Sequence, residues 1–286
     1  MGLIRKLLRP LSPFFFRFRL IFFRLIGIKR FEIVWNRGLG DIALGLYGLN
    51  LRIYEIIPDA QIHYFTRSDL KEGFTLLANC NVTVDVAMKR GQKVVWSQNK
   101  PPNTVRIFKP NPTDWLKDQL KKVVPKLKIE FPSIVLDKSE VALHVDSETG
   151  QYYGYEKNWP IEKFKILIEK LNEKGVIPVL IGLKKTEDFS HLKVKDLRGE
   201  LGLIELMQYL LGFVKVLVAP DSGILSILYY LDVAIPIKVV SFWSDPHQGI
   251  LKQGVKSPNP YLDHFALVQK DLRQLEPKRL LDAILC

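Results

Sequence analysis

Cysteine is nearly absent from this sequence: only Cys80 and Cys286 occur among 286 residues, far apart and outside any metal-binding or redox spacing. This excludes a disulfide scaffold and a cysteine zinc site, and it is typical of a protein from a reducing compartment. The five histidines show no paired metal spacing, no two aspartates lie two residues apart, and no G-x-S-x-G sequence is present. We therefore expect no metal site and no serine-hydrolase elbow.

Acidic residues are absent from the first thirty positions, whereas the whole chain contains 30 Asp and Glu against 42 Lys and Arg. The formal charge of +12 is therefore concentrated at this end, which holds eight basic residues: Arg5, Lys6, Arg9, Arg17, Arg19, Arg24, Lys29 and Arg30. The same segment is rich in Leu and Phe, but no uncharged run in it approaches the ~18 residues that a membrane span needs. No small-residue cleavage site for a signal peptide follows it.

Such a basic and aromatic segment favours contact with an anionic membrane surface, where apolar groups enter the headgroup boundary and Arg or Lys meets lipid phosphate. The residues we expect at that surface are Arg5, Lys6, Arg9, Arg17, Arg19 and Arg24. The alternative is that residues 1–30 pack as a basic helix pair on the protein's own body. Nucleic acid is not expected as a partner, because the rest of the chain carries no basic stripe and no binding motif.

After residue 30, short apolar runs alternate with amphipathic stretches, which predicts β-α-β units and parallel sheets. Strands are expected at 31–35, 61–65, 82–86, 94–96, 104–108, 141–145, 176–181, 214–219 and 237–242, with helices at 41–56, 70–77, 114–124, 161–174, 203–211, 222–231 and 272–285. We predict an α/β protein with two Rossmann-like doubly wound domains facing a central cleft. Its parts are a membrane-surface segment (1–30), a first domain (31–125), a linker (126–133), a second domain (134–270) and a C-terminal helix (271–286).

A glycine turn after the first predicted strand, Gly38-x-Gly40-x-x-Ala43, formally matches the dinucleotide fingerprint. Asp41 argues against a dinucleotide, because its charge stands where the pyrophosphate would meet the helix N-terminus. That terminus favours an ionised carboxylate, which can accept a proton from an attacking hydroxyl. The alternative is an Asp41 side chain that only caps the helix.

Five sequence pieces occur in order over residues 31–254. They are Arg37–Leu44 with Ile57–Ile62, Val141–His144 with Lys157–Pro160 and Phe164, Asp196–Gly199, Val218–Gly223, and Phe242–Pro246. Together they resemble glycosyltransferase family 9, the ADP-heptose heptosyltransferases. The resemblance implies the two-Rossmann type B fold and a metal-independent, inverting sugar transfer from a nucleotide donor to a lipopolysaccharide acceptor. It also implies a cytoplasmic protein, peripheral on the inner face of the cytoplasmic membrane.

The resemblance further implies site residues. Asp41 would be the general base, Lys157 would contact the donor diphosphate, and no cofactor would be needed besides the nucleotide-sugar substrate, such as ADP-heptose. The turn formed by Asp221, Ser222 and Gly223 opens a helix and points backbone N–H groups at an anion. Since Asp221 would itself repel phosphate, we expect it to hold a sugar or ribose hydroxyl, or to cap the helix.

Ser147 and Thr149 precede Lys157 and are expected to donate to phosphate, while His144 either touches the ligand or belongs to the core. Three departures from the family pattern leave the substrate open. Ser226 stands where the family commonly has histidine, Trp243-Ser244-Asp245-Pro246 replaces the usual Gly-Pro-Thr-Asp-Pro, and the first domain is short. The alternatives are a transferase that uses another nucleotide sugar and a non-catalytic, membrane-associated protein with the same fold.

Overall fold

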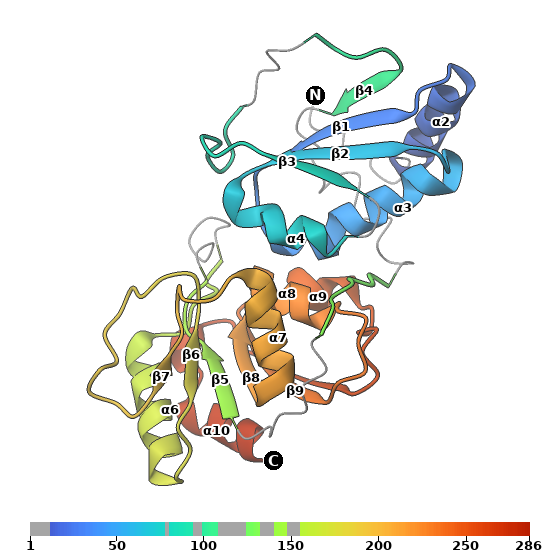
Figure 1. The fold of residues 1–286 in the computed structure, drawn as a ribbon. Helices are drawn as coiled ribbons and strands as arrows, with labels where there is room; N and C mark the ends of the chain where they lie inside the picture. The colour runs from blue at the N-terminus through green and yellow to red at the C-terminus, as the bar shows by residue number, and fades with distance from the viewer. Residues whose placement is uncertain (1–11, 78–79, 94–98, 108–123, 132–139, 148–154) are drawn as a thin grey trace. The chain divides into compact units, whose positions relative to one another are not determined.

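The computed structural model describes residues 12–77, 80–93, 99–107, 124–131, 140–147 and 155–286. The chain divides into two compact units, coloured from blue to red along the sequence in Figure 1. Unit 1 comprises Met1–Lys128 with Gln253–Lys256, and unit 2 comprises Ile129–Lys252 with Ser257–Cys286. Each unit is built around its own parallel sheet.

The sheet of unit 1 has four described strands: β1 (Arg30–Trp35), β2 (Gln61–Thr66), β3 (Asn81–Val84) and β4 (Thr104–Ile107). Their order is β3-β2-β1-β4 and every pair is parallel. Central β1 is buried at five of its six positions, as expected for a parallel strand covered on both faces. The four matching strand predictions are confirmed, whereas the predicted strand at 94–96 and nearly all of the predicted helix at 114–124 lie outside the described residues.

The described helices of unit 1 are α2 (Ser12–Leu25), the π-helix η2 (Ile42–Leu46), α3 (Tyr47–Ile56), the 3-10 turn η3 (Ser68–Leu70) and α4 (Lys71–Thr75). The predicted helix at 41–56 is therefore present, but residues 42–46 form a π turn. Such turns are rare and are frequent at functional sites.

The sheet of unit 2 has six described strands: β5 (Glu140–His144), β6 (Val179–Ile181), β7 (Lys195–Asp196), β8 (Val214–Pro220), β9 (Ile237–Trp243) and β10 (Leu262–Val268). Their order, β10-β9-β8-β5-β6-β7, is that of a complete Rossmann sheet. The chain reverses its direction of travel across the sheet between β5 and β8, and it does so between β1 and β4 in unit 1. Ligands of such sheets bind outside the carboxyl ends of the strands at this reversal.

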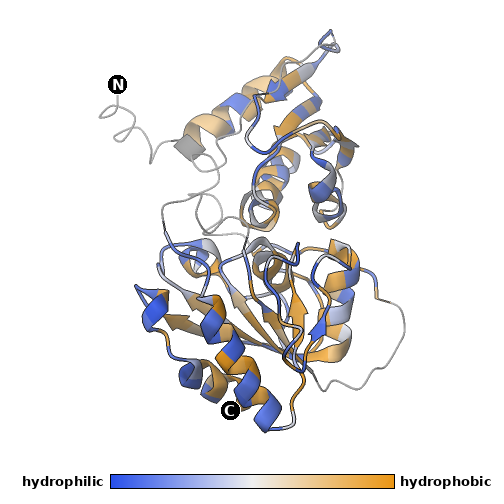
Figure 2. Ribbon diagram, turned by 90° about the vertical axis from the view of Figure 1, so that its left-hand side faces the viewer, coloured by the Kyte–Doolittle hydropathy of each residue, from blue (hydrophilic) through white to orange (hydrophobic). Residues whose placement is uncertain are grey.

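The described helices of unit 2 include α6 (Ile161–Glu173), α7 (Leu203–Phe213), α8 (Gly223–Tyr229), α9 (Gly249–Gln253) and α10 (Pro277–Leu285). Buried Trp159, Phe164 and Phe242 pack edge to face or tilted, with ring centroids 4.9–6.3 Å apart. In Figure 2 most of the sheet of this unit is orange, which marks its apolar core, whereas its helices are mixed orange and blue.

The C-terminal helix predicted at 271–286 is wrong in its first third. A 3-10 turn, η5 (Leu272–Gln274), is followed by two extended residues, and α10 begins only at Pro277. Proline fits the first turn of a helix but disfavours helical backbone just before it. The Trp159 indole N–H and the Lys163 ammonium both donate to the carbonyl of Leu275, at 3.0 and 3.1 Å, which holds the break in place.

Candidate active site

Asp41 follows β1 at the carboxyl edge of the unit 1 sheet, on the side where the strand order reverses. Its backbone is helical and precedes η2, but its side chain makes no capping hydrogen bond. The carboxylate instead lies over Gly38: a Cβ atom at that position would be only 2.8 Å from Asp41 Oδ2. Pure capping, the alternative drawn from the sequence, is therefore not what this aspartate does.

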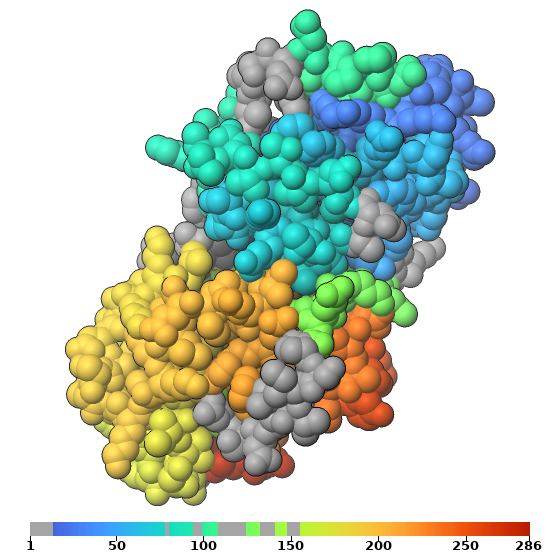
Figure 3. Space-filling view, viewed as in Figure 1, coloured from blue at the N-terminus to red at the C-terminus, as the bar shows by residue number. Residues whose placement is uncertain are grey.

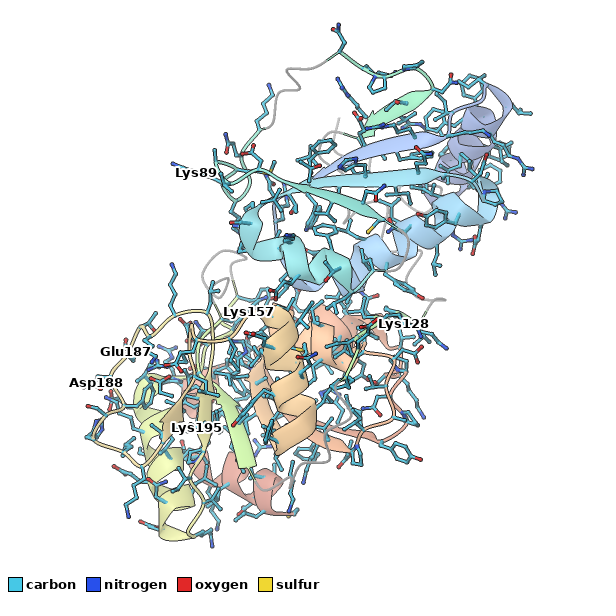
Figure 4. All side chains as sticks on the ribbon, viewed as in Figure 1. Lys89, Lys128, Lys157, Glu187, Asp188 and Lys195 are labelled. Atoms are coloured by element: carbon cyan, nitrogen blue, oxygen red, sulfur yellow. The ribbon has the colours of Figure 1, made fainter. Side chains whose placement is uncertain are left out.

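The glycine turn that carries Asp41 is fixed from several sides. The Trp35 indole N–H donates to the Gly38 carbonyl at 3.2 Å, and the Arg67 guanidinium donates to the Arg37 carbonyl at 3.3 Å. The Asn36 amide donates to the carbonyls of Lys89, labelled in Figure 4, and Gln92. Gly40 begins the helical turn that leads into η2. These bonds hold the backbone of the turn that carries Asp41, and a fixed position of the catalytic group is a condition for efficient proton transfer.

Lys157 lies at the carboxyl edge of the unit 2 sheet (Figure 4), where it pairs with the residue that follows β8. Its ammonium is 2.9 Å from Asp221 Oδ2, and both side chains are only 8% exposed. The Tyr155 hydroxyl donates to the same carboxylate oxygen at 2.5 Å, and the Lys157 Nζ stands 5.0 Å from the centre of the Tyr155 ring. A buried cation is thus held in one place by a buried carboxylate and an aromatic face.

Asp221 is confined on its other side by Gly249, which has a φ of +47°. A Cβ at position 249 would lie 2.5 Å from Asp221 Oδ1 and 2.8 Å from the Trp243 ring. Only glycine adopts that backbone conformation without strain and leaves room for both groups. Tyr155 and Gly249 were missed by the sequence reasoning, because neither lies in a recognisable spacing.

Ser147 is buried beside this pair, and its hydroxyl donates to the Asp221 carbonyl over a long 3.4 Å. Asn158 ties the two ends of the intervening loop together: its amide oxygen accepts from the Ser147 N–H at 2.8 Å, and its amide N–H donates to Asp146 at 2.7 Å. Thr149, the other predicted phosphate contact in this loop, lies outside the described residues.

Ser222 is the N-cap of α8, since its hydroxyl accepts from the Leu225 N–H at 3.1 Å. The same hydroxyl is 3.2 Å from Nδ1 of buried His144, and Ser226 donates to the Ser222 carbonyl at 3.0 Å. Capping of α8 is thus performed by Ser222, with Gly223 as the first helical residue, while Asp221 faces Lys157. Sequence reasoning proposed the three residues as one donor-binding turn, but the structure gives them different partners.

Burial of His144 predicts a specific dependence of stability on pH. Desolvation lowers the pKa of His144 to about 4, against 6.5 for an accessible imidazole. Below pH 6.5 the His144 imidazole binds a proton in the unfolded chain but not in the folded chain. The unfolding free energy therefore decreases as the pH drops from about 6.5 to about 4. We expect a contribution of about 3 kcal/mol to this fall, from about 1.4 kcal/mol per pKa unit.

Chemical unfolding at a series of pH values tests this expectation with His144→Asn, which retains an acceptor for Ser222. The unfolding free energy of the variant should therefore decrease less than that of the wild type as the pH drops, by roughly the contribution of His144. A smaller slope remains, because burial also lowers the pKa of His264 to about 4. An unchanged slope in His144→Asn would show that His144 already accepts a proton in the folded protein.

Among the residues that the structure describes, no three His, Cys, Asp or Glu side chains gather closely enough to hold a metal ion.

Similar structures identify the fold. A family 9 glycosyltransferase from Veillonella parvula superposes with a TM-score of 0.54 and 12% identity, over 90% of this chain and 96% of that one. The ADP-heptose lipopolysaccharide heptosyltransferase II of E. coli gives 0.51 and 13%, over 90% and 97%. The fold is that of family 9 glycosyltransferases. The iron-containing dodecameric glycosyltransferase TibC of enterotoxigenic E. coli also matches, with a TM-score of 0.50 and 14% identity, over 82% of this chain and 62% of that one.

The resemblance seen in the sequence pieces is thus confirmed for the family 9 fold, and the predicted α/β class with parallel sheets is confirmed with it. No family model matches the sequence, and no curated protein matches it either. At these identities the structural matches establish the fold alone, so the activity must be argued from the residues.

Proposed function

We propose that the protein is an inverting, metal-independent glycosyltransferase that moves heptose from ADP-heptose to a lipopolysaccharide-type acceptor. One observation carries this proposal. In each unit a charged group suited to sugar transfer lies at the carboxyl edge of a Rossmann-like sheet, where the strand order reverses. In unit 1 this group is Asp41, which follows β1. In unit 2 it is Lys157, which pairs with Asp221 after β8. This is where nucleotides and their partners bind in such sheets.

Sugar transfer by this mechanism needs one carboxylate and one cation. Asp41 accepts the proton of an acceptor hydroxyl as that oxygen attacks the anomeric carbon of the donor. The bond from this carbon to the diphosphate breaks in the same step, which inverts the anomeric centre. The Lys157 ammonium stabilises the negative charge that grows on the departing nucleoside diphosphate. The proposal requires the two units to present Asp41 and Lys157 to one donor and acceptor in a shared cleft.

Asp221 has a separate part in this mechanism. Its Oδ2 atom positions Lys157, so the cation is in place without the entropy cost of ordering a free lysine side chain. A carboxylate in this position also accepts hydrogen bonds from sugar hydroxyls, as we propose for the transferred sugar. Ser147 and Thr149 are proposed to donate to the phosphates, with the donor and the lipid-linked acceptor meeting at the inner face of the cytoplasmic membrane.

Ligand-dependent stabilisation tests the donor. A ligand present at 100 times its dissociation constant raises the unfolding free energy by about 2.7 kcal/mol, which a thermal shift detects readily. We expect ADP-heptose to stabilise the full chain more than UDP-, GDP- or CMP-sugars do. If only another nucleotide sugar stabilised the chain, the donor would not be ADP-heptose, but the proposal of a glycosyltransferase would stand. Stabilisation by none of them would contradict the donor site itself.

A further inference from the structure

Helix α2 is apolar on two opposite sides. On the inner side, Phe16 and Leu20 are buried and the helix packs on α3. Phe23, one turn further along this side, stands edge-on to Phe31 of β1 with ring centroids 6.3 Å apart. This inner side follows the spacing of an ordinary surface helix and fixes α2 to unit 1.

The outer side of α2 is apolar where a surface helix normally turns polar groups to water. Phe14, Phe18 and Phe22 follow one another at helical spacing, and each is more than half exposed, while Leu25 is 79% exposed. The full set of large apolar residues exposed on or beside the helix is Phe14, Phe15, Phe18, Ile21, Phe22, Leu25 and Ile26. In Figure 2 the helix is largely orange with blue stretches, and in Figure 3 the dark blue residues of this segment reach the surface of unit 1.

Arginines border this outer face. At 100° per residue, Arg17 and Arg24 lie about a quarter-turn to one side of the exposed Phe stripe, and Arg19 lies on the other side. All three are exposed, and the Arg19 guanidinium stands 5.5 Å from the Phe23 ring. Two acids of unit 1 are paired with other basic residues: Glu32 is 3% exposed and pairs with Arg30 and Arg106, and Asp59 pairs with Lys29. The hydrogen bond from Lys29 lowers the pKa of Asp59, and the charge of Arg24 also lowers it.

We propose that α2 lies flat in the headgroup region of an anionic lipid bilayer, with the outer stripe inserted and Arg17, Arg19 and Arg24 against lipid phosphates. The positive charge at the borders of the outer face favours an anionic bilayer over a second copy of the chain as the partner of this face. A symmetric dimer through this face would bring the arginine borders of both copies together, and like charges repel. An anionic bilayer supplies both an apolar layer for the outer stripe and negative charge for the arginines at its borders. The inference is independent of whether the chain transfers a sugar.

Among the described residues, no helix combines the length and the apolar character that crossing a bilayer requires.

Co-sedimentation of the full chain with vesicles tests the proposal. The vesicles are phosphatidylcholine alone or phosphatidylcholine with phosphatidylglycerol. We expect Phe18→Ser with Phe22→Ser to weaken partitioning onto the anionic vesicles at least about tenfold. A matched control is Tyr261→Ser with Phe265→Ser, which removes two aromatic residues of similar exposure at β10 and should leave partitioning unchanged.

Arg17→Gln with Arg24→Gln gives an independent measure, because it leaves the apolar stripe intact. It should weaken binding to anionic vesicles about tenfold at low salt and leave binding to neutral vesicles unchanged. Equal partitioning of the Phe variant and the wild type would overturn the proposal. So would a lipid-free wild-type dimer, seen by analytical ultracentrifugation, that the Phe variant converts to monomer, since the occupant would then be a second copy.

Discussion

Asp41→Asn is expected to slow sugar transfer by about 10²–10⁴-fold while the donor still binds. Asparagine has nearly the same shape as aspartate, but its amide cannot take a proton from the acceptor hydroxyl. Since the Asp41 side chain does not cap η2, the helix should not depend on its charge. Turnover of the nucleotide sugar with acceptor measures the first effect, and ADP binding by calorimetry measures the second.

Two further variants make the Asp41 experiment specific. Asp59→Asn removes another aspartate of unit 1, whose partner Lys29 is equally exposed, and it should leave turnover unchanged. Gly38→Ala places a methyl group 2.8 Å from the resting position of the Asp41 carboxylate, so it should slow transfer in the wild type. In the Asp41→Asn background it should have no further effect on turnover, because both changes act on the same proton transfer. Full activity of Asp41→Asn would exclude the base.

The core strands were readable from the sequence because parallel strands buried on both faces are short apolar runs. β1, β8 and β9 are of this kind, and each was predicted to within one or two residues. β10 was missed because it lies at the edge of its sheet and alternates only loosely, with Phe265 and Val268 exposed. Two-residue β7 is too short to leave a periodic signal.

The candidate site was readable only as separate residues. Asp41, Lys157 and Asp221 could be named from their motifs, but the pairing of Lys157 with Asp221 joins a loop residue to the residue that follows β8, and the fold brings the two together. The contributions of Tyr155 and Gly249 also depend on side chains that meet only in the folded chain. A lone tyrosine or glycine carries no such information in the sequence.

The first thirty residues allowed two interpretations, contact with a membrane surface and packing on the protein's own body. The structure explains why the sequence pattern did not distinguish them. α2 uses one side for packing on α3 and leaves another apolar side exposed, so its arginines occupy the borders instead of one polar face. A helix with two apolar sides shows a weak single-face periodicity. Arg5, Lys6 and Arg9 lie outside the described residues, so their membrane contact stays a prediction.

Lys157→Met should remove both stability and activity. It leaves Asp221 buried beside Tyr155 with no cation, and breaking a buried pair in this way costs about 3–5 kcal/mol of unfolding free energy. Lys185→Met is the matched control, because the Lys185–Glu200 pair is about half exposed and solvent screens it, so its loss should change the unfolding free energy little. Chemical unfolding of both variants measures the difference.

The double variant Lys157→Met with Asp221→Asn separates the two roles of the lysine. It removes both charges, and the asparagine oxygen still accepts from Tyr155, so most of the lost stability should return. Activity should not return, because the leaving diphosphate has lost its cation. Affinity for ADP should fall about tenfold to a hundredfold, as for a lost charge-assisted hydrogen bond, whereas affinity for uncharged adenosine should stay the same. If stability, turnover and ADP binding recovered together, Lys157 would be a structural partner of Asp221, and the departing phosphates would have to be stabilised by another group.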